Sequence, residues 1–130
     1  MKRILFFAIL LCCSSGIFAQ DEKPVYNGTG AEIYFTKTSI NLGTLKLGDV
    51  KETYFVFQNI GKKPLILDDV IISCDCTEID WPKAPVMPGQ SAKIKVTYTA
   101  KHSGSINKWA TVLSNAESDR VILRIKGEVN

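Results

Sequence analysis

The chain has 130 residues, of which 45% are hydrophobic and 22% are charged, and its formal net charge is +3 at pH 7. A chain of this length can bury one sizeable hydrophobic core without cross-links, so a cysteine-stapled miniprotein is excluded. The basic residues form no tract that could neutralise a row of phosphates, so we expect no nucleic-acid partner.

The N-terminal segment has the layout of a secretory signal peptide. Lys2 and Arg3 form a positive region, Ile4 to Cys13 is an unbroken apolar run, and Ala19 provides a small residue for cleavage. A transmembrane helix needs roughly 20 apolar residues, and this run is shorter. We expect a signal peptide over residues 1–19, export to the periplasm, the extracellular medium or the cell surface, and no membrane span.

A lipoprotein signal is the alternative, because Cys12 and Cys13 end the apolar run. It is disfavoured because Leu11, which is not a small residue, precedes Cys12. Cleavage after Ala19 would leave 14 basic residues against 13 acidic ones, a net charge of about +1. Two of the four cysteines would remain, in a compartment where disulfides can form.

The predicted mature chain begins with a polar stretch, and strand patterns follow it. Residues 20–30, QDEKPVYNGTG, are expected to be a flexible lead-in. After residue 30 the hydrophobic period is two, as where Ile94, Val96 and Tyr98 alternate with lysine and threonine. β-Branched and aromatic residues, which favour strands, dominate these runs. The expected strands cover roughly residues 31–36, 39–45, 50–59, 64–73, 91–100, 105–114 and 119–128.

These strands predict an all-β fold, an immunoglobulin-like antiparallel β-sandwich of about seven strands in one domain over residues 31–130. A small closed barrel is the alternative. The antibody-type Cys…Trp…Cys pattern is absent, so we expect packing, not a bridge between sheets, to hold the domain together.

Several residues between or within these strands have structural explanations. Gly48 and Gly89 suit turns, where glycine permits positive φ. Asn59 and Gly61 suit a strand exit in left-handed backbone, which both residue types tolerate. The acidic pair at 68–69 is expected to form a turn or bulge inside its strand.

A set of short motifs in a fixed order resembles a known family. The motifs are INLGTL at 40–45 with Gly48, FVFQNIG at 55–61, PL at 64–65, SCDCT at 73–77, WP at 81–82, PGQS at 88–91, IKVTY at 94–98, SN at 114–115 and IKGEV at 125–129. Over about residues 32–129 the chain resembles the bacterial domain-of-unknown-function family 1573, which is similar to the immunoglobulin-like domains of Hydin and major sperm protein. The resemblance implies an exported β-sandwich accessory domain. Asp75 stands where the family often has Gly.

Cys74 and Cys76 are the candidate disulfide or thiol pair. A disulfide closing a three-residue loop contributes about 1.6 kcal/mol by loop entropy, against about 4.7 kcal/mol for a 100-residue loop. In an extended strand their Cα atoms would lie about 6.5–7 Å apart, at the edge of disulfide reach, so a local turn is required. Packing of the two cysteines near a strand end, with a local disulfide formed after export, is the interpretation that the residues favour.

Two chemical roles for the pair remain open as alternatives. A redox thiol needs a depressed pKa, but Glu78 and Asp80 surround the pair with negative charge and only Lys83 opposes them. A zinc site usually needs four ligands, and His102 adds only one to the two thiols; Cu(I) could use two thiolates with Met87. We expect no cofactor, no metal site and no catalytic residue.

Two tryptophans and a leucine are candidates for a partner surface. Trp109 and Leu113 share one face of their predicted strand, opposite Ala110 and Val112. If the latter face is buried, the former is an exposed apolar patch; a shift of one residue reverses this. Trp81 belongs to a proline-rich loop. We therefore expect a non-enzymatic exported module that binds or supports an envelope or secreted protein, with thiol-redox or metal-binding function as the alternative.

Overall fold

The computed structural model describes residues 23–130, so the predicted signal peptide and its cleavage site lie outside the described residues. The described chain forms eight strands and contains no helix. They are β1 (Ile33–Phe35), β2 (Ser39–Leu45), β3 (Val50–Asn59), β4 (Leu67–Ile72), β5 (Thr77–Asp80), β6 (Ser91–Thr99), β7 (Gly104–Ser114) and β8 (Arg120–Val129). No helix among these residues could therefore cross a membrane.

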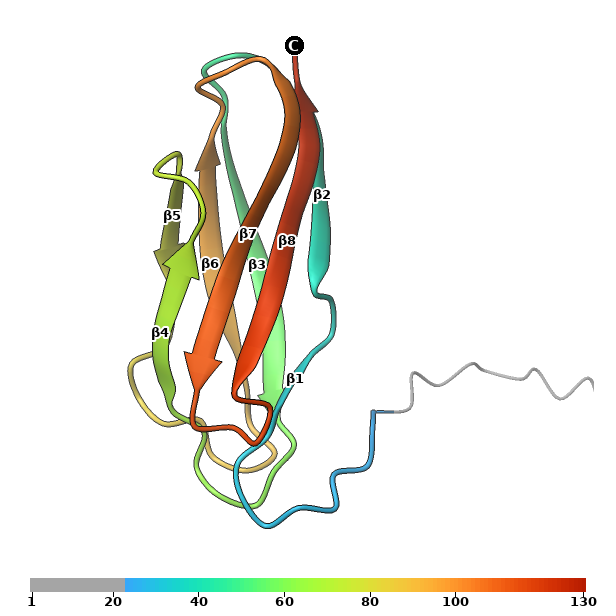
Figure 1. Ribbon diagram of the computed structural model, residues 1–130, viewed down its shortest axis with the longest axis vertical. Helices are drawn as coiled ribbons and strands as arrows, with labels where there is room; N and C mark the ends of the chain where they lie inside the picture. The colour runs from blue at the N-terminus through green and yellow to red at the C-terminus, as the bar shows by residue number, and fades with distance from the viewer. Residues whose placement is uncertain (1–22) are drawn as a thin grey trace, which may run out of the picture.

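The strands form two four-stranded sheets that pack face to face (Figure 1). The order is β1-β3-β6-β5 in one, called here the β3 sheet, and β2-β8-β7-β4 in the other, the β8 sheet. The lead-in reaches the sandwich at the end opposite to the C-terminus (Figure 1). The predicted immunoglobulin-like sandwich is confirmed.

Two details of the sandwich differ from the prediction. β5 is an additional strand, which pairs with β6 and places Asp80 opposite Lys95. β2 runs parallel to β8, whereas all neighbouring strands were expected to be antiparallel. The parallel pair arises because the chain leaves the β3 sheet after Phe35 and, after three intervening residues, enters the β8 sheet at Ser39 without reversing direction.

The core lies between the sheets and follows the alternation of the strands. Phe55 and Phe57 of β3 are fully buried, as their shared side of the strand predicted, and Phe57 lies 5.5 Å from Phe35 between ring centroids. The β8 sheet contributes the buried side chains of Leu123 and Ile125. No bridge between the sheets is present in the described part of the chain, where the single disulfide is local.

The turns and the bulge agree with the sequence, but the strand exit after β3 does not. Gly48 and Gly89 have φ of +92° and +82°, and the β4–β7 register shifts between Leu67 and Asp69. Asn59 and Gly61, however, are not left-handed: no described non-glycine residue has positive φ, and Gly61 is not among the glycines that do. The expectation of left-handed backbone there is wrong.

The hydrogen bonds of its side chain explain why an asparagine stands at position 59. Its side chain is fully buried and donates to the carbonyl oxygens of Lys63 at 2.8 Å and Val86 at 2.9 Å. Its Oδ1 accepts from the Gly61 amide at 2.9 Å. Asn59 therefore joins the β3–β4 connection to the loop that precedes β6.

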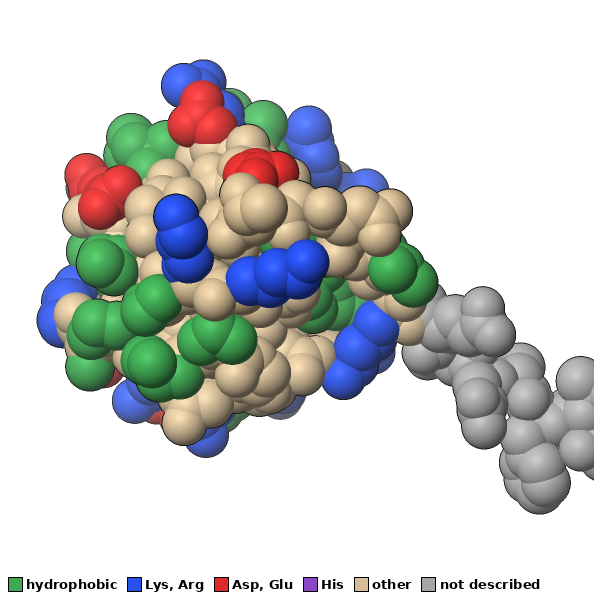
Figure 2. Space-filling view, turned by 90° about the horizontal axis from the view of Figure 1, so that it is seen from below, with side chains coloured by type: hydrophobic (Ala, Val, Ile, Leu, Met, Phe, Trp, Pro, Cys, Tyr) green, Lys and Arg blue, Asp and Glu red, His purple; other side chains and the backbone are tan. Residues whose placement is uncertain are grey.

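The end of the sandwich that is seen in Figure 2 carries acidic and basic side chains close together, with hydrophobic groups between them. Charge of neither sign gathers into one field on this view. This end of the sandwich therefore presents no single-sign field that would select a charged ligand.

Candidate functional site

Cys74 and Cys76 form a disulfide in the connection between β4 and β5. Their Cα atoms lie 5.3 Å apart, which is closer than two residues of an extended strand, so the required turn is present. The Thr77 amide donates to the Cys74 carbonyl at 3.3 Å and closes this turn. Cys76 is buried and Cys74 is half-buried against the core. In this oxidised state neither sulfur is a thiolate that could attack a substrate or bind a metal.

The remaining chemical candidates are scattered. Within residues 23–130, no three His, Cys, Asp or Glu side chains gather in a way that could hold a metal ion. His102 lies exposed in the connection between β6 and β7.

Trp81 is held in its loop and is only partly exposed. The ring packs against the core, and the Lys83 Nζ lies 2.8 Å from the ring centroid. The buried indole Nε1 has no hydrogen-bond partner among the described residues. Trp81 thus packs in the proline-rich loop that follows β5 of the β3 sheet, whereas Trp109 and Leu113 lie on β7 of the β8 sheet.

Trp109 lies on the outer side of β7, because Ala110 and Val112 fill the core. Of the two arrangements that the sequence left open, this is the one with an exposed patch: 47% of the Trp109 surface is accessible, while Leu113 is half-buried. The Trp109 amide donates to the Ser73 Oγ at 3.0 Å, and the Ser73 amide donates to the Trp109 carbonyl at 3.1 Å. These bonds tie the tryptophan to the disulfide connection.

Two isoleucines that the sequence did not single out extend the patch. Thr111 of β7 lies between Ile71 of β4 and Ile122 of β8 in the register of the sheet. Ile71 is 52% exposed and Ile122 is 47% exposed. The outer sides of β4, β7 and β8 therefore share an apolar patch, the tryptophan face, which comprises Ile71, Trp109, Leu113 and Ile122.

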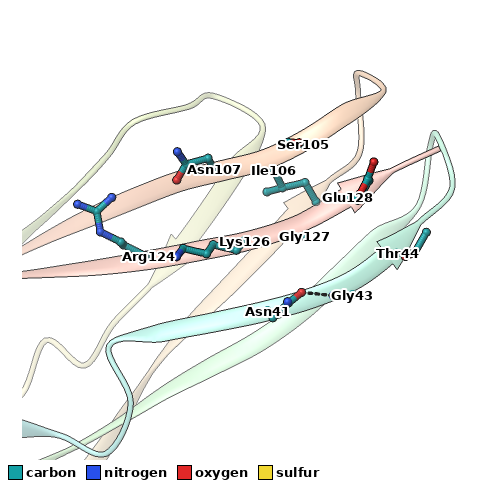
Figure 3. A pocket seen from close by; sticks show the side chains of 10 residues that line it. All are labelled: Asn41, Gly43, Thr44, Ser105, Ile106, Asn107, Arg124, Lys126, Gly127 and Glu128. Atoms are coloured by element: carbon teal, nitrogen blue, oxygen red, sulfur yellow. Dashed lines mark hydrogen bonds between the residues drawn. The ribbon is translucent and has the colours of Figure 1, made fainter.

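A polar hollow lies next to this patch and was also missed. It has a volume of about 630 Å³ and is lined by β2, β7 and β8, principally by Asn41, Gly43, Asn107, Arg124 and Lys126 (Figure 3). Arg124 lies opposite Trp109, so the hollow and the tryptophan face are contiguous.

The hollow owes its shape to a bulge in β2. The β2–β8 register shifts between Asn41 and Thr44, and Gly43 has φ of +76° with no side chain to fill the space. The Asn41 Oδ1 accepts from the Gly43 amide at 2.8 Å, as the dashed line in Figure 3 shows. The INLGTL motif contains the signal for this bulge, but the outward position of its neighbours depends on pairing with β8.

Lys95 on the β3 sheet differs from Arg124 and Lys126 on the β8 sheet, because only Lys95 has an acidic partner among the described residues. On the β3 sheet, Lys95 forms an ion pair with Glu52 at 2.7 Å, and this hydrogen bond raises the pKa of Lys95. On the β8 sheet, Arg124 and Lys126 form no ion pair with any residue in the described range. Their nearest cross-strand neighbours on β7 are Trp109 and Asn107.

The architecture is that of an immunoglobulin-like β-sandwich, and solved domains share it. PapD-like domain 7 of human CEP192 is 11% identical, with a TM-score of 0.64, over 86% of this chain and 94% of that domain. Residues 33–129 match the family described as protein of unknown function (DUF1573), and the chain belongs to this family. The resemblance read from the sequence is confirmed.

Other solved structures share the fold but are longer proteins. A protein of unknown function from Porphyromonas gingivalis is 18% identical, with a TM-score of 0.69, over 77% of this chain and 47% of that chain. The secreted serine protease VesC from Vibrio cholerae is 11% identical, with a TM-score of 0.59, over 75% of this chain and 23% of that chain. This chain therefore spans about half of the first protein and a quarter of the second. No curated protein matches.

Proposed function

We propose that the chain is an exported, non-catalytic immunoglobulin-like module that binds another envelope or secreted protein through the tryptophan face. The observation that carries this proposal is the exposure of Ile71, Trp109 and Ile122 side by side on neighbouring strands. Contiguous exposed apolar residues on a small domain mark an interaction site, and tryptophan is enriched among the residues that dominate binding energy.

Burial of the tryptophan face could contribute a binding free energy large enough for a specific protein–protein contact. Burial of the exposed half of Trp109, about 100 Å² of mostly apolar surface, would contribute about 2.5 kcal/mol. Ile71 and Ile122 lie on either side of the Thr111 position and would add to it. The strand pairing on both sides of β7 holds these residues in place, so little ordering is needed on binding.

Export is proposed from the N-terminal pattern at residues 1–19, and a binding role in place of catalysis is proposed from the state of the cysteines. The bonded pair provides no free thiolate, and Cys76 is buried. The disulfide then serves to hold the β4–β5 connection against β7.

The test compares two serine variants of the tagged protein in its host. Trp109→Ser/Ile122→Ser removes the apolar contacts of the tryptophan face, and Tyr54→Ser/Val56→Ser is the matched control, because these two side chains are exposed on the β3 sheet. We expect the first variant alone to lose a specific cross-linked complex seen with the wild type. Loss in the control but not in the Trp109 variant would refute the assignment of the surface.

A further inference from the structure

Beyond the binding role proposed above, on which this inference rests, we propose that the polar hollow selects an acidic segment of the partner protein, whose carboxylates contact Arg124 and Lys126 while an apolar side chain packs on Trp109. The juxtaposition that carries the proposal is the hollow drawn in Figure 3, with its unpaired donors, directly beside the exposed Trp109, which lies opposite Arg124 in the register of the same sheet.

Four of the ten residues that line the hollow carry side-chain N–H donors that have no partner among the described residues. Arg124 and Lys126 can only donate, through five and three N–H groups respectively. Among the described residues, neither side chain has a hydrogen-bond or ion-pair partner, and the same holds for the Asn107 amide. The Asn41 Oδ1 is occupied by the Gly43 amide, which leaves its Nδ2 as a further donor. A ligand rich in acceptors complements this set.

The positive charge of the hollow lies toward the end that adjoins Trp109. Glu128 is its one acidic residue, and it lies at the other end of the hollow, opposite Ser105 of β7 and Thr44 of β2. Arg124 lies at the end next to Trp109, with Lys126 between it and Glu128, and Arg124 offers the planar fork that binds a carboxylate through two parallel hydrogen bonds (Figure 3). Carboxylates are therefore the ligand groups that fit this position.

The spacing along β8 favours a peptide over other anions. Ile122, Arg124 and Lys126 point outward at every second residue, so they lie about 6.5–7 Å apart. An extended peptide presents its own alternate side chains at the same interval. It can place one apolar and two acidic groups over these three positions, whereas an acidic saccharide supplies carboxylates but no aliphatic side chain for the tryptophan face.

The experiment titrates the isotopically labelled exported protein with two synthetic octapeptides. One is Ac-Leu-Thr-Leu-Thr-Glu-Thr-Glu-Thr-NH2, and its matched control replaces both glutamates by glutamine. We expect the acidic peptide to shift the Trp109 indole resonance and the amides of Asn107 and Lys126, and to leave the Trp81 indole unchanged. We expect the glutamine peptide to bind on the order of tenfold more weakly, because two charge-assisted contacts are lost.

Charge-neutralising variants give the second arm of the test. Arg124→Gln/Lys126→Gln should bring the affinity for the acidic peptide down to that for the neutral one. The control Lys62→Gln/Lys63→Gln removes the same charge from exposed positions in the β3–β4 connection and should change nothing. The affinity should also fall as salt is raised, because the contacts are solvent-exposed.

Equal binding of the two peptides, or resonance shifts away from the hollow, would overturn the proposal. So would binding of a glucuronate oligosaccharide in the absence of peptide binding. If Arg124→Gln/Lys126→Gln retains the cross-linked complex that Trp109→Ser/Ile122→Ser loses, the acidic specificity is refuted and the binding function stands. If both variants retain the cross-linked complex, the acidic specificity and the proposed binding through the tryptophan face are both refuted.

Discussion

Asn59 shows how one side chain can organise three segments of the sandwich. Its buried amide satisfies the Val86 and Lys63 carbonyls and the Gly61 amide. We expect Asn59→Ala to lower the free energy of unfolding by about 2–4 kcal/mol, because buried polar groups lose their partners. Urea denaturation measures this. Gln58→Ala removes only an exposed bond to the Gly89 carbonyl and should cost less than about 1 kcal/mol; equal costs would contradict this account.

Glycine is required at position 61 because neighbouring backbone atoms leave no room for a Cβ atom. A Cβ at this position would lie 2.5 Å from the Gly30 carbonyl oxygen and 2.7 Å from the Ala31 carbonyl carbon. Backbone atoms cannot move aside cheaply, so we expect Gly61→Ala to destabilise the domain by at least about 2 kcal/mol. A thermal unfolding comparison with Lys62→Ala, at the exposed neighbouring position, isolates the effect. A melting temperature equal to that of the Lys62→Ala protein would be incompatible with the close approach.

The sequence pointed to these residues but could not supply the reasons. FVFQNIG marked Asn59 and Gly61 as a strand exit, and both positions are indeed special. Local conformational preference suggested left-handed backbone, whereas the deciding partners, Val86 and Gly30, are distant in the sequence. Contacts of this kind follow only from the tertiary arrangement.

The sequence alone could not decide which side chains of β7 point outward. Both faces of β7 carry apolar residues, so alternation alone could not decide between Trp109 and Ala110. Register with β8 resolves it, because Leu123 lies opposite Ala110 and both are fully buried. The hollow escaped prediction for the same reason, since it depends on the pairing of β2 with β8, two strands that are far apart in the sequence.

Because Leu123 faces the core and Ile122 faces outward, alanine substitutions at these adjacent positions of β8 should destabilise the domain to different extents. Leu123→Ala should cost about 2–5 kcal/mol, because it removes a fully buried side chain. Ile122→Ala removes a half-exposed one and should cost less than about 1 kcal/mol. Chemical denaturation of the two variants under the same conditions gives both numbers. A larger cost at Ile122 would mean that the strand faces the other way.

β5 was not predicted because its alternation of Thr77 and Ile79 with two acidic residues covers only four residues, which is too short to stand out as a strand pattern. Its stability comes from pairing with β6 and from the short connection through Cys74 and Cys76. The disulfide closes a very small loop, so we expect Cys74→Ala/Cys76→Ala to retain the fold and lose about 1–2 kcal/mol. Unfolding of the oxidised and reduced wild-type protein should differ by a similar amount. Failure of the double variant to fold would show that the bond is essential.

At the scale of the whole molecule, the proposed export predicts which form of the chain meets a partner. We expect the intact mass of the protein secreted by its host to correspond to a chain that begins at Gln20, and the two cysteines to be alkylated only after reduction. A mass that includes residues 1–19 would contradict the predicted cleavage. A lipid adduct on Cys12 or Cys13 would instead identify a lipoprotein.

The central claim, that this exported module binds a protein through the tryptophan face, is tested most directly by site-specific photo-cross-linking in host cells. A photoreactive amino acid is placed at Thr111, between Ile71 and Ile122, or at Thr97 on the β3 sheet as the control. We predict a discrete cross-linked product from Thr111 that Trp109→Ser abolishes, and none from Thr97. Cross-links from Thr97 alone, or from both positions irrespective of Trp109, would contradict the claim.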